Sequence, residues 1–246
     1  MQTQTTTLPK ASLDVATLID QRNQLFINHA KAQLKDLSAY STEALEWLMM
    51  EHYQFSFRNT VFLSDAAKLT GAFDTDAVQK ELWRNFEEEN GHAAMYKAAL
   101  KKIGVDVETR EEFPATTHFL NTIGNLVDAE PSAVLGTLFA TETAAIFEHE
   151  VFRDISVEVL KRRSLEAQGG PLVWFHDMHL DGVEQSHRDE LGIFLRGWPV
   201  EQEVAEKDGV RPTIRTHQAL HGADLAIEAM TIWWQNLLAQ AKTTSH

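Results

Sequence analysis

The sequence predicts an all-α protein, a bundle of about seven helices in one domain. Two observations support this prediction: apolar residues recur at intervals of three and four over long stretches, and most of the 6 prolines and 12 glycines fall between these stretches. Such intervals place apolar side chains on one face of a helix. Because no stretch shows the alternation of a β-strand, long segments joined by short breaks indicate a helical bundle.

The breaks in the apolar pattern give the bounds of the expected helices in chain order. We expect helices at residues 12–37, 41–71, 76–104, 116–127, 131–163, 172–195 and 213–241. In the third helix, Gln79 lies three residues after Asp76 and is placed to complete a capping box. Pro131 is placed at the first position of the fifth helix, where its missing N–H costs nothing. Gly169 and Gly170 separate the fifth helix from the sixth.

The helical pattern extends over residues 12–242, which we interpret as a single domain. Residues 1–11 are polar and rich in threonine, and we expect them to form a flexible tail, because they lack the apolar stretch of a signal peptide. The longest expected loops, 105–115 and 197–211, are too short for a second domain. No apolar run reaches the roughly 20 residues that a membrane span needs. We therefore expect a cytoplasmic protein that has no membrane partner.

The composition restricts the chemistry that the protein can perform. There are 36 acidic and 22 basic residues, so the net charge is −14. Nucleic acids and anionic membrane surfaces are bound by basic patches, and we expect neither as a partner. The chain has no cysteine, which excludes disulfides, thiolate metal sites and cysteine nucleophiles. Any metal must therefore be held by nitrogen and oxygen ligands, and 11 histidines are available.

One carboxylate interrupts an apolar stripe in the fifth helix. Glu142 falls between Leu138 and Phe139 on one side and Ile146 on the other. A buried carboxylate is costly unless it is paired, protonated or bound to a metal. On its own, Glu142 is explained equally well by a structural bond to an arginine or to the backbone.

Two Glu-x-x-His pairs lie in separate long helices, Glu89 with His92 and Glu184 with His187. Three residues of a helix place both members of a pair on one face. Either pair alone is also typical of a solvated surface. Together with Glu142 on the helix between them, however, they match the ligands with which helical bundles hold two metal ions. Such ligands suit iron and leave positions open for dioxygen and substrate, although they also bind manganese.

Two stretches of the chain resemble the haem-oxygenase-like di-iron oxidases. They are Asn85-Phe-Glu-Glu-Glu-Asn-Gly-His92-Ala-Ala-Met-Tyr96, continued by Leu100 and Ile103-Gly-Val-Asp106, and Pro131-Ser-Ala-Val-Leu-Gly136-Thr-Leu-Phe-Ala-Thr-Glu142. This family includes an alkene-forming fatty-acid decarboxylase, N-oxygenases and the Chlamydia protein associating with death domains. The resemblance covers about residues 43–238 and implies a haem-oxygenase-like helical bundle.

The same resemblance implies a set of metal ligands on three helices. The six residues that match are Glu89, His92, Glu142, His179, Glu184 and His187. The family has one residue fewer between the first histidine and the acid of the sixth helix. On a regular helix, the side chains of His179 and Glu184 would point about 140° apart. A π-bulge near Gly182 would absorb the extra residue; without one, Asp181 or His176 would replace His179.

The function implied by the resemblance is that of a non-haem iron oxidase or oxygenase. It would hold Fe(II)/Fe(III), as two ions of which one is bound weakly, and would use O2 to oxidise a small-molecule substrate in biosynthesis. The implied reactions are oxidative C–C cleavage of a carboxylate or amino acid and N-oxygenation of an amine. The spacing of Glu89 and His92 resembles the decarboxylase and favours the first reaction. No catalytic residues are expected beyond the ligands, and a homodimer is compatible with the sequence.

Three other interpretations fit parts of the sequence, and one histidine pair lies outside the residues that carry the resemblance. A ferritin-like di-iron bundle would need a further carboxylate from the second helix, such as Glu51. A thiaminase-like hydrolase usually relies on a cysteine nucleophile, which this chain lacks. A non-catalytic interaction protein would keep the same polar residues for structural reasons. His217 and His221 lie one turn apart in the seventh helix, and their spacing fits a metal pair or a surface pair.

Overall fold

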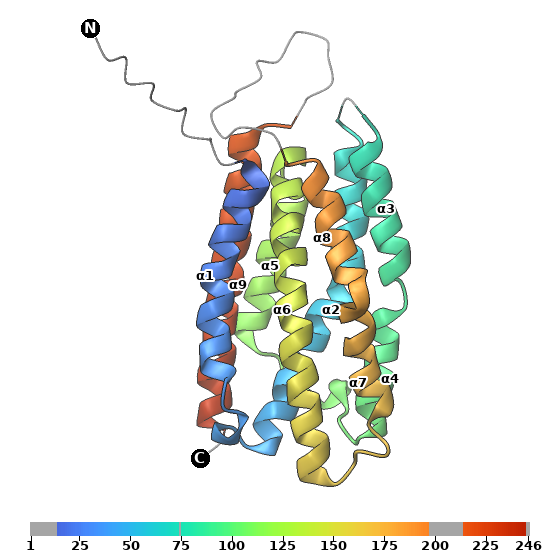
Figure 1. The fold of residues 1–246 in the computed structure, drawn as a ribbon, viewed down its shortest axis with the longest axis vertical. Helices are drawn as coiled ribbons and strands as arrows, with labels where there is room; N and C mark the ends of the chain where they lie inside the picture. Colours follow the sequence, from blue (N-terminus) through green and yellow to red (C-terminus); the bar gives the residue numbers. More distant parts are fainter. Residues whose placement is uncertain (1–13, 74, 197–213, 245–246) are drawn as a thin grey trace, which may run out of the picture.

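In the computed structural model, the chain folds into a bundle of helices that run along one long axis (Figure 1). The structure describes residues 14–73, 75–196 and 214–244, and these residues contain no β-strand. Their α-helices are α1 (Val15–Leu34), α2 (Thr42–Thr70), α3 (Ala77–Glu89), α4 (His92–Lys102), α5 (Pro114–Val127), α6 (Pro131–Arg163), α7 (Gly170–Met178), α8 (Glu184–Ile193) and α9 (Thr216–Thr243). The all-α prediction is therefore confirmed.

Two of the seven expected helices are interrupted, and both interruptions lie beside predicted metal ligands. The third expected helix is divided into α3 and α4. The sixth is divided into α7 and α8, which are joined by a π turn at His179–Val183. Short 3-10 turns at Leu37–Ala39 and Val107–Thr109 complete the elements, and the second of them lies in the expected loop 105–115. The expected tail 1–11 and the loop 197–211 lie outside the described residues.

Several helix ends follow from local sequence signals, and one expected cap does not form. The side chain of Ser41 accepts a hydrogen bond from the backbone N–H of Ala44 and caps α2. Pro131 begins α6, as predicted. The predicted capping box of α3 is wrong, because Asp76 makes no capping bond and the side-chain amide of Gln79 donates instead to the backbone carbonyl of Ala67, at 2.9 Å.

Helix α6 lies at the centre of the bundle, with α1 and α9 on one side and α7 and α8 on the other (Figure 1). Its side chains are buried all round over residues 132–142, which include Glu142, and Glu148 and His149 are buried further along. A helix that is buried on every face belongs to the core, so polar groups on it must find partners inside the protein. Among the described residues, no helix is both long enough and apolar enough to cross a bilayer.

Two glycines allow α6 and α9 to touch backbone to backbone. A Cβ added to Gly136 would lie 1.8 Å from the carbonyl oxygen of Ala219, and one added to Gly222 would lie 2.2 Å from that of Ala133. Real side chains never approach so closely, so this contact requires glycine on both helices. It fixes the position of α6 along the bundle and therefore how deeply Glu142 is buried.

Candidate metal centre

Glu89 and His92 are brought together across a break between two helices. Glu89 is the last residue of α3 and His92 the first of α4. Between them, Gly91 takes a φ of 104°, in the left-handed region that favours glycine. The expectation of one continuous helix over residues 76–104 is wrong here, because this backbone turn ends the first helix. The two side chains still meet, with His92 Nδ1 at 3.0 Å from Glu89 Oε2.

The extra residue between His179 and Glu184 is absorbed by the π turn. Inside this turn, Asp181 has φ −80° and ψ 31°, and Gly182 has φ 103°. The result is that His179 Nε2 and Glu184 Oε1 face the same side, 4.0 Å apart. The extra residue is absorbed near Gly182 as predicted, but by a kink at which Gly182 takes a left-handed φ and not by a π-bulge within one continuous helix. Asp181 is exposed, so it does not take the place of His179 in the cluster.

Glu89, His92 and His179 form the first of three sets, among the residues that the structure describes, whose ligand atoms all lie within 4.8 Å of one another. His179 Nδ1 lies 2.6 Å from the backbone carbonyl of Phe175, so this nitrogen donates and Nε2 keeps its lone pair. His92 Nδ1 lies 3.1 Å from His179 Nε2. Metal–imidazole bonds of about 2.1 Å place neighbouring ligands about 3 Å apart, so this spacing suits two ligands of one ion.

Glu142, Glu184 and His187 form a second set. His187 Nε2 lies 2.9 Å from Glu88 Oε2, which leaves Nδ1 to face the cluster. Nδ1 lies 3.7 Å from Glu142 Oε2 and 3.8 Å from Glu89 Oε1. A histidine held by a carboxylate through its outer nitrogen is the usual arrangement of a metal ligand.

Because its two oxygens face different histidines, Glu89 can bridge the two sets. Its Oε2 faces His92, and its Oε1 faces His187. Both Glu89 Oε1 and His187 Nδ1 are buried and make no hydrogen bond. Buried polar atoms are nearly always paired, so these two atoms indicate a missing partner such as a metal ion. The residues present therefore fit a metal site.

His149 forms a third set with His179 and Glu184, and it is not among the ligands predicted from the sequence. Its Nε2 lies 3.3 Å from Glu184 Oε1. His149 follows Glu142 on α6 by seven residues, which is close to two full helical turns. Extending the stripe that contains Glu142 by one heptad would have found it. Glu88, the partner of His187, was also missed, because three consecutive glutamates look like a solvated surface.

The charges of the cluster are set by burial and by the crowding of carboxylates. Burial raises the pKa of Glu184 well above its ordinary value, and the neighbouring Glu142 and Glu89 raise it further. Burial would lower the pKa of His187, but the nearby Glu142 carboxylate, the hydrogen bond to Glu88 and the Glu89 charge together raise it to about 9. Burial lowers the pKa of His179, which favours its neutral, metal-binding form. The cluster thus combines crowded carboxylates with imidazoles, and both are donors that divalent cations bind.

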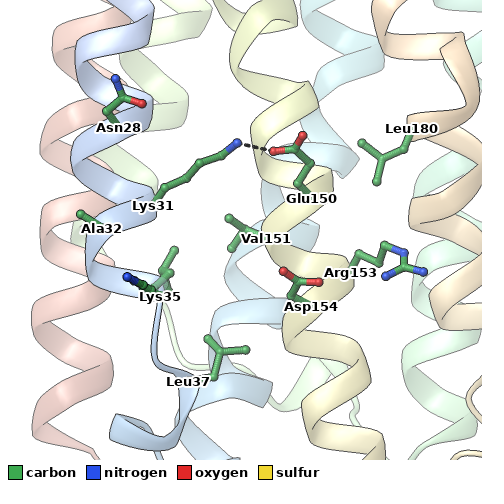
Figure 2. A pocket seen from close by; sticks show the side chains of 11 residues that line it. Asn28, Lys31, Ala32, Lys35, Leu37, Glu150, Val151, Arg153, Asp154 and Leu180 are labelled. Carbon is green, nitrogen blue, oxygen red and sulfur yellow. Dashed lines mark hydrogen bonds and ion pairs between the residues drawn. The ribbon is translucent and has the colours of Figure 1, made fainter.

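A small cavity adjoins the candidate ligands, whereas a larger groove lies elsewhere. The cavity, of about 30 Å³, has a lining that includes Glu89, His149 and Glu184, and its volume is near that of one water molecule. The groove, of about 700 Å³, lies between α1 and α6, where Lys31 pairs with Glu150 (Figure 2). None of the candidate ligands lines this groove, so its size does not make it the reaction site.

The other residues singled out from the sequence lie outside the three sets. His217 and His221 are exposed on α9. His176 is buried behind His149, with its Nδ1 3.1 Å from His149 Nδ1. Glu51 is buried and binds Arg110 through both oxygens, at 2.6 and 2.8 Å. The further carboxylate that a ferritin-like site would need is therefore occupied by an arginine.

Comparison with known proteins identifies the fold. No family model matches the sequence, and no curated protein matches it significantly. A CADD-like protein of unknown function from Nostoc punctiforme is 22% identical, with a TM-score of 0.71 over 92% of this chain and 98% of that chain. A TenA homologue from Pseudomonas syringae pv. tomato is 11% identical, with a TM-score of 0.66 over 92% of this chain and 96% of that one.

A third similar structure has a fold that is already known. It is a domain of unknown function with a haem-oxygenase-like fold from Shewanella denitrificans, 17% identical, with a TM-score of 0.57 over 92% of this chain and 89% of that one. The predicted haem-oxygenase-like helical bundle is therefore confirmed. At these identities, the likeness concerns the fold alone.

Proposed function

We propose that the protein is a non-haem iron oxidase or oxygenase, which uses O2 to oxidise a small metabolite. The observation that carries the proposal is the convergence of three carboxylates and three imidazoles in a buried cluster. The six residues are Glu89, His92, Glu142, His179, Glu184 and His187. Mixed carboxylate and imidazole ligands without thiolates are typical of iron sites that react with O2.

The proposal assigns a separate task to each part of the cluster. Glu89, His92 and His179 would hold one ion, and Glu142, Glu184 and His187 a second. Iron bound there would supply the electrons that activate O2. The chain itself orients the ligands, through the backbone carbonyl of Phe175 at His179 and through Glu88 at His187.

The surroundings of the cluster favour chemistry that excludes bulk water. His179 and His187 have side chains only 2% and 1% exposed. The aromatic rings of Tyr96 and Phe175 stack behind the cluster, with ring centroids 4.6 Å apart. An apolar wall of this kind limits the escape of reactive species and strengthens electrostatic interactions within the site.

A test measures iron binding and O2 consumption by the same preparation. Metal-free protein is loaded anaerobically with Fe(II) and then exposed to O2 with candidate carboxylic acids, amino acids and amines. We expect iron to bind and O2 to be consumed, faster with the true substrate. The product distinguishes oxidative C–C cleavage from N-oxygenation, because the first releases a shortened product and the second keeps every carbon.

Two ligand variants and one matched variant make the test specific. Glu142→Ala and His92→Ala should abolish iron-dependent O2 consumption, because each removes a ligand from one of the two sets. His118→Ala, on the exposed face of α5, should leave it unchanged. Full activity in either ligand variant would refute the proposal. A folded wild-type protein that binds no iron would favour the alternative of a non-catalytic interaction protein.

A further inference from the structure

We propose that the small cavity beside the metal centre is the entry site for protons, with Glu148 as the residue that donates them. The inference rests on the proposed function, because only a centre that reduces O2 consumes protons. Each electron that reduces O2 towards water must be balanced by a proton. The candidate ligands His179 and His187 have side chains only 2% and 1% exposed, so protons from bulk water need a route through the protein.

The wall of this cavity joins the metal centre to polar residues that are not ligands. Its lining includes four candidate ligands, which are Glu89, His92, His179 and Glu184. It also includes four polar residues that belong to none of the three metal-binding sets, which are His52, Ser56, Asn59 and Glu148. The volume of about 30 Å³ is near that of one water molecule, so a single water in the cavity would touch both groups.

Glu148 is buried, and one of its oxygens makes no hydrogen bond. Oε1 accepts a hydrogen bond from Trp234 Nε1 at 2.9 Å. Oε2 has no hydrogen-bond partner in the part of the chain that the structure describes, and it lies 3.8 Å from His52 Nε2, beyond hydrogen-bond distance. Because buried polar atoms are nearly always paired, Oε2 indicates a further partner, and a water in the cavity would supply it.

The surroundings of Glu148 favour a protonated carboxyl group near neutral pH. Burial raises the pKa of Glu148 to about 7, although the hydrogen bond from Trp234 opposes the rise. Burial also lowers the pKa of His52 to about 3, so this imidazole is neutral and gives Glu148 no compensating charge. A carboxyl group that keeps its proton near neutral pH is suited to act as a general acid.

The proton transfer balances through the water in the cavity. The O–H bond at Glu148 Oε2 breaks, and its proton passes to this water. The water gives one of its own protons to the oxygen atom that is being reduced, for which the iron supplies the electrons. Ser56 and Asn59 line the cavity and are only half-buried, so they form a polar route to solvent. Water that enters along this route returns a proton to Glu148.

The experiment compares Glu148→Gln with wild-type protein, both loaded anaerobically with Fe(II). The amide keeps an oxygen for the bond from Trp234 but has no acidic proton. We expect wild-type affinity for Fe(II), and a rate of O2 consumption that falls by about 100-fold or more. The remaining rate should slow in D2O by a larger factor than the wild-type rate does, because proton delivery becomes the slowest step. Glu228→Gln makes the same change at an exposed position of α9 and should match wild type throughout.

The outcomes separate this inference from the proposed function. A folded Glu148→Gln variant that consumes O2 at the wild-type rate would overturn the role of Glu148 alone. A folded variant that no longer binds Fe(II) would also overturn it, because Glu148 would then support the ligands instead of donating protons. Wild-type protein that binds iron but consumes no O2 would overturn the proposed function and this inference together.

A crystal structure of the metal-free wild-type protein tests the inference even where the variant does not fold. It should show one ordered water in the cavity, within about 3 Å of Glu148 Oε2. A dry cavity, or a Glu148 carboxyl group that is bonded directly to His52, would overturn the proposal.

Discussion

Glu51 and the acids of the candidate metal centre are all buried, but their partners differ. Glu51 accepts two hydrogen bonds from Arg110, and Thr116 accepts one from Trp233 Nε1 at 2.8 Å. Thr116 in turn donates to Glu51. We call these four residues the Glu51 cluster. In the candidate metal centre, by contrast, carboxylates face histidines and one another, and two buried ligand atoms make no hydrogen bond.

The difference shows that burial of an acid does not by itself indicate a functional site. The Glu51 side chain is 0% exposed, more deeply buried than Glu142 or Glu89 at 5% and 9%, yet its charge is matched by an arginine. Among the described residues, the three acids of the metal centre face histidines and one another, and none of the three pairs with an arginine or a lysine. The informative signal is therefore the absence of an internal partner.

The largest effect on stability is expected in the Glu51 cluster. Glu51→Leu should lower the free energy of unfolding of the metal-free protein by about 3 kcal/mol, because it leaves the Arg110 charge buried without its partner. Urea denaturation measures this loss. The double variant Glu51→Leu/Arg110→Leu should recover part of it, since no unpaired charge remains. A single variant as stable as wild type would show that the Glu51 cluster is not structural.

A metal should stabilise the protein by binding at the candidate metal centre and not at the Glu51 cluster. At a free Co(II) concentration of 100 times the dissociation constant, binding to the folded state adds about 2.7 kcal/mol per site. The rise in melting temperature on adding Co(II) should therefore persist in Glu51→Leu and shrink in Glu142→Ala. An equal rise in both variants would place the metal outside the candidate centre and remove the contrast between the clusters.

The sequence predicted the bundle well, because its helices follow from apolar periodicity and from glycine and proline breaks. The six candidate ligands could also be named from the sequence. The π turn was predictable because the spacing of His179 and Glu184 fits no regular helix. The break at Gly91 was not predictable, because a glycine inside a helical pattern is often tolerated. Only its positive φ shows that the helix ends there.

The partners of the ligands could not be predicted, because they depend on contacts between distant segments. His176 contacts His149, which lies 27 residues earlier in the chain, and nothing in the sequence predicts this contact. The pairing of Glu51 with Arg110 joins residues 59 apart, so the sequence could not decide whether Glu51 belonged to a metal site. Helix periodicity shows which face a residue occupies, but not which residue of another helix lies opposite it.

The smallest predicted change in stability is a gain, in a variant of Glu184. It tests the difference between the Glu51 cluster and the candidate metal centre most directly. In metal-free protein, burial raises the pKa of Glu184, and the adjacent Glu142 and Glu89 raise it further. Because the folded pKa lies above the unfolded value, this carboxyl costs stability as the pH rises from the unfolded pKa to the folded one. Glu184→Gln removes that cost and should stabilise the metal-free protein by on the order of 1 kcal/mol at pH 8.

The gain should be smaller at pH 5, where the unfolded chain is still partly protonated. Urea denaturation with a chelator at both pH values measures it. The same variant should lose metal binding, so a residue that destabilises the empty bundle would be kept for its ligand role. If Glu184→Gln instead lowered stability as much as Glu51→Leu does, Glu184 would be a structural residue. The two clusters would then be alike, and the case for a metal centre would lose its physical basis.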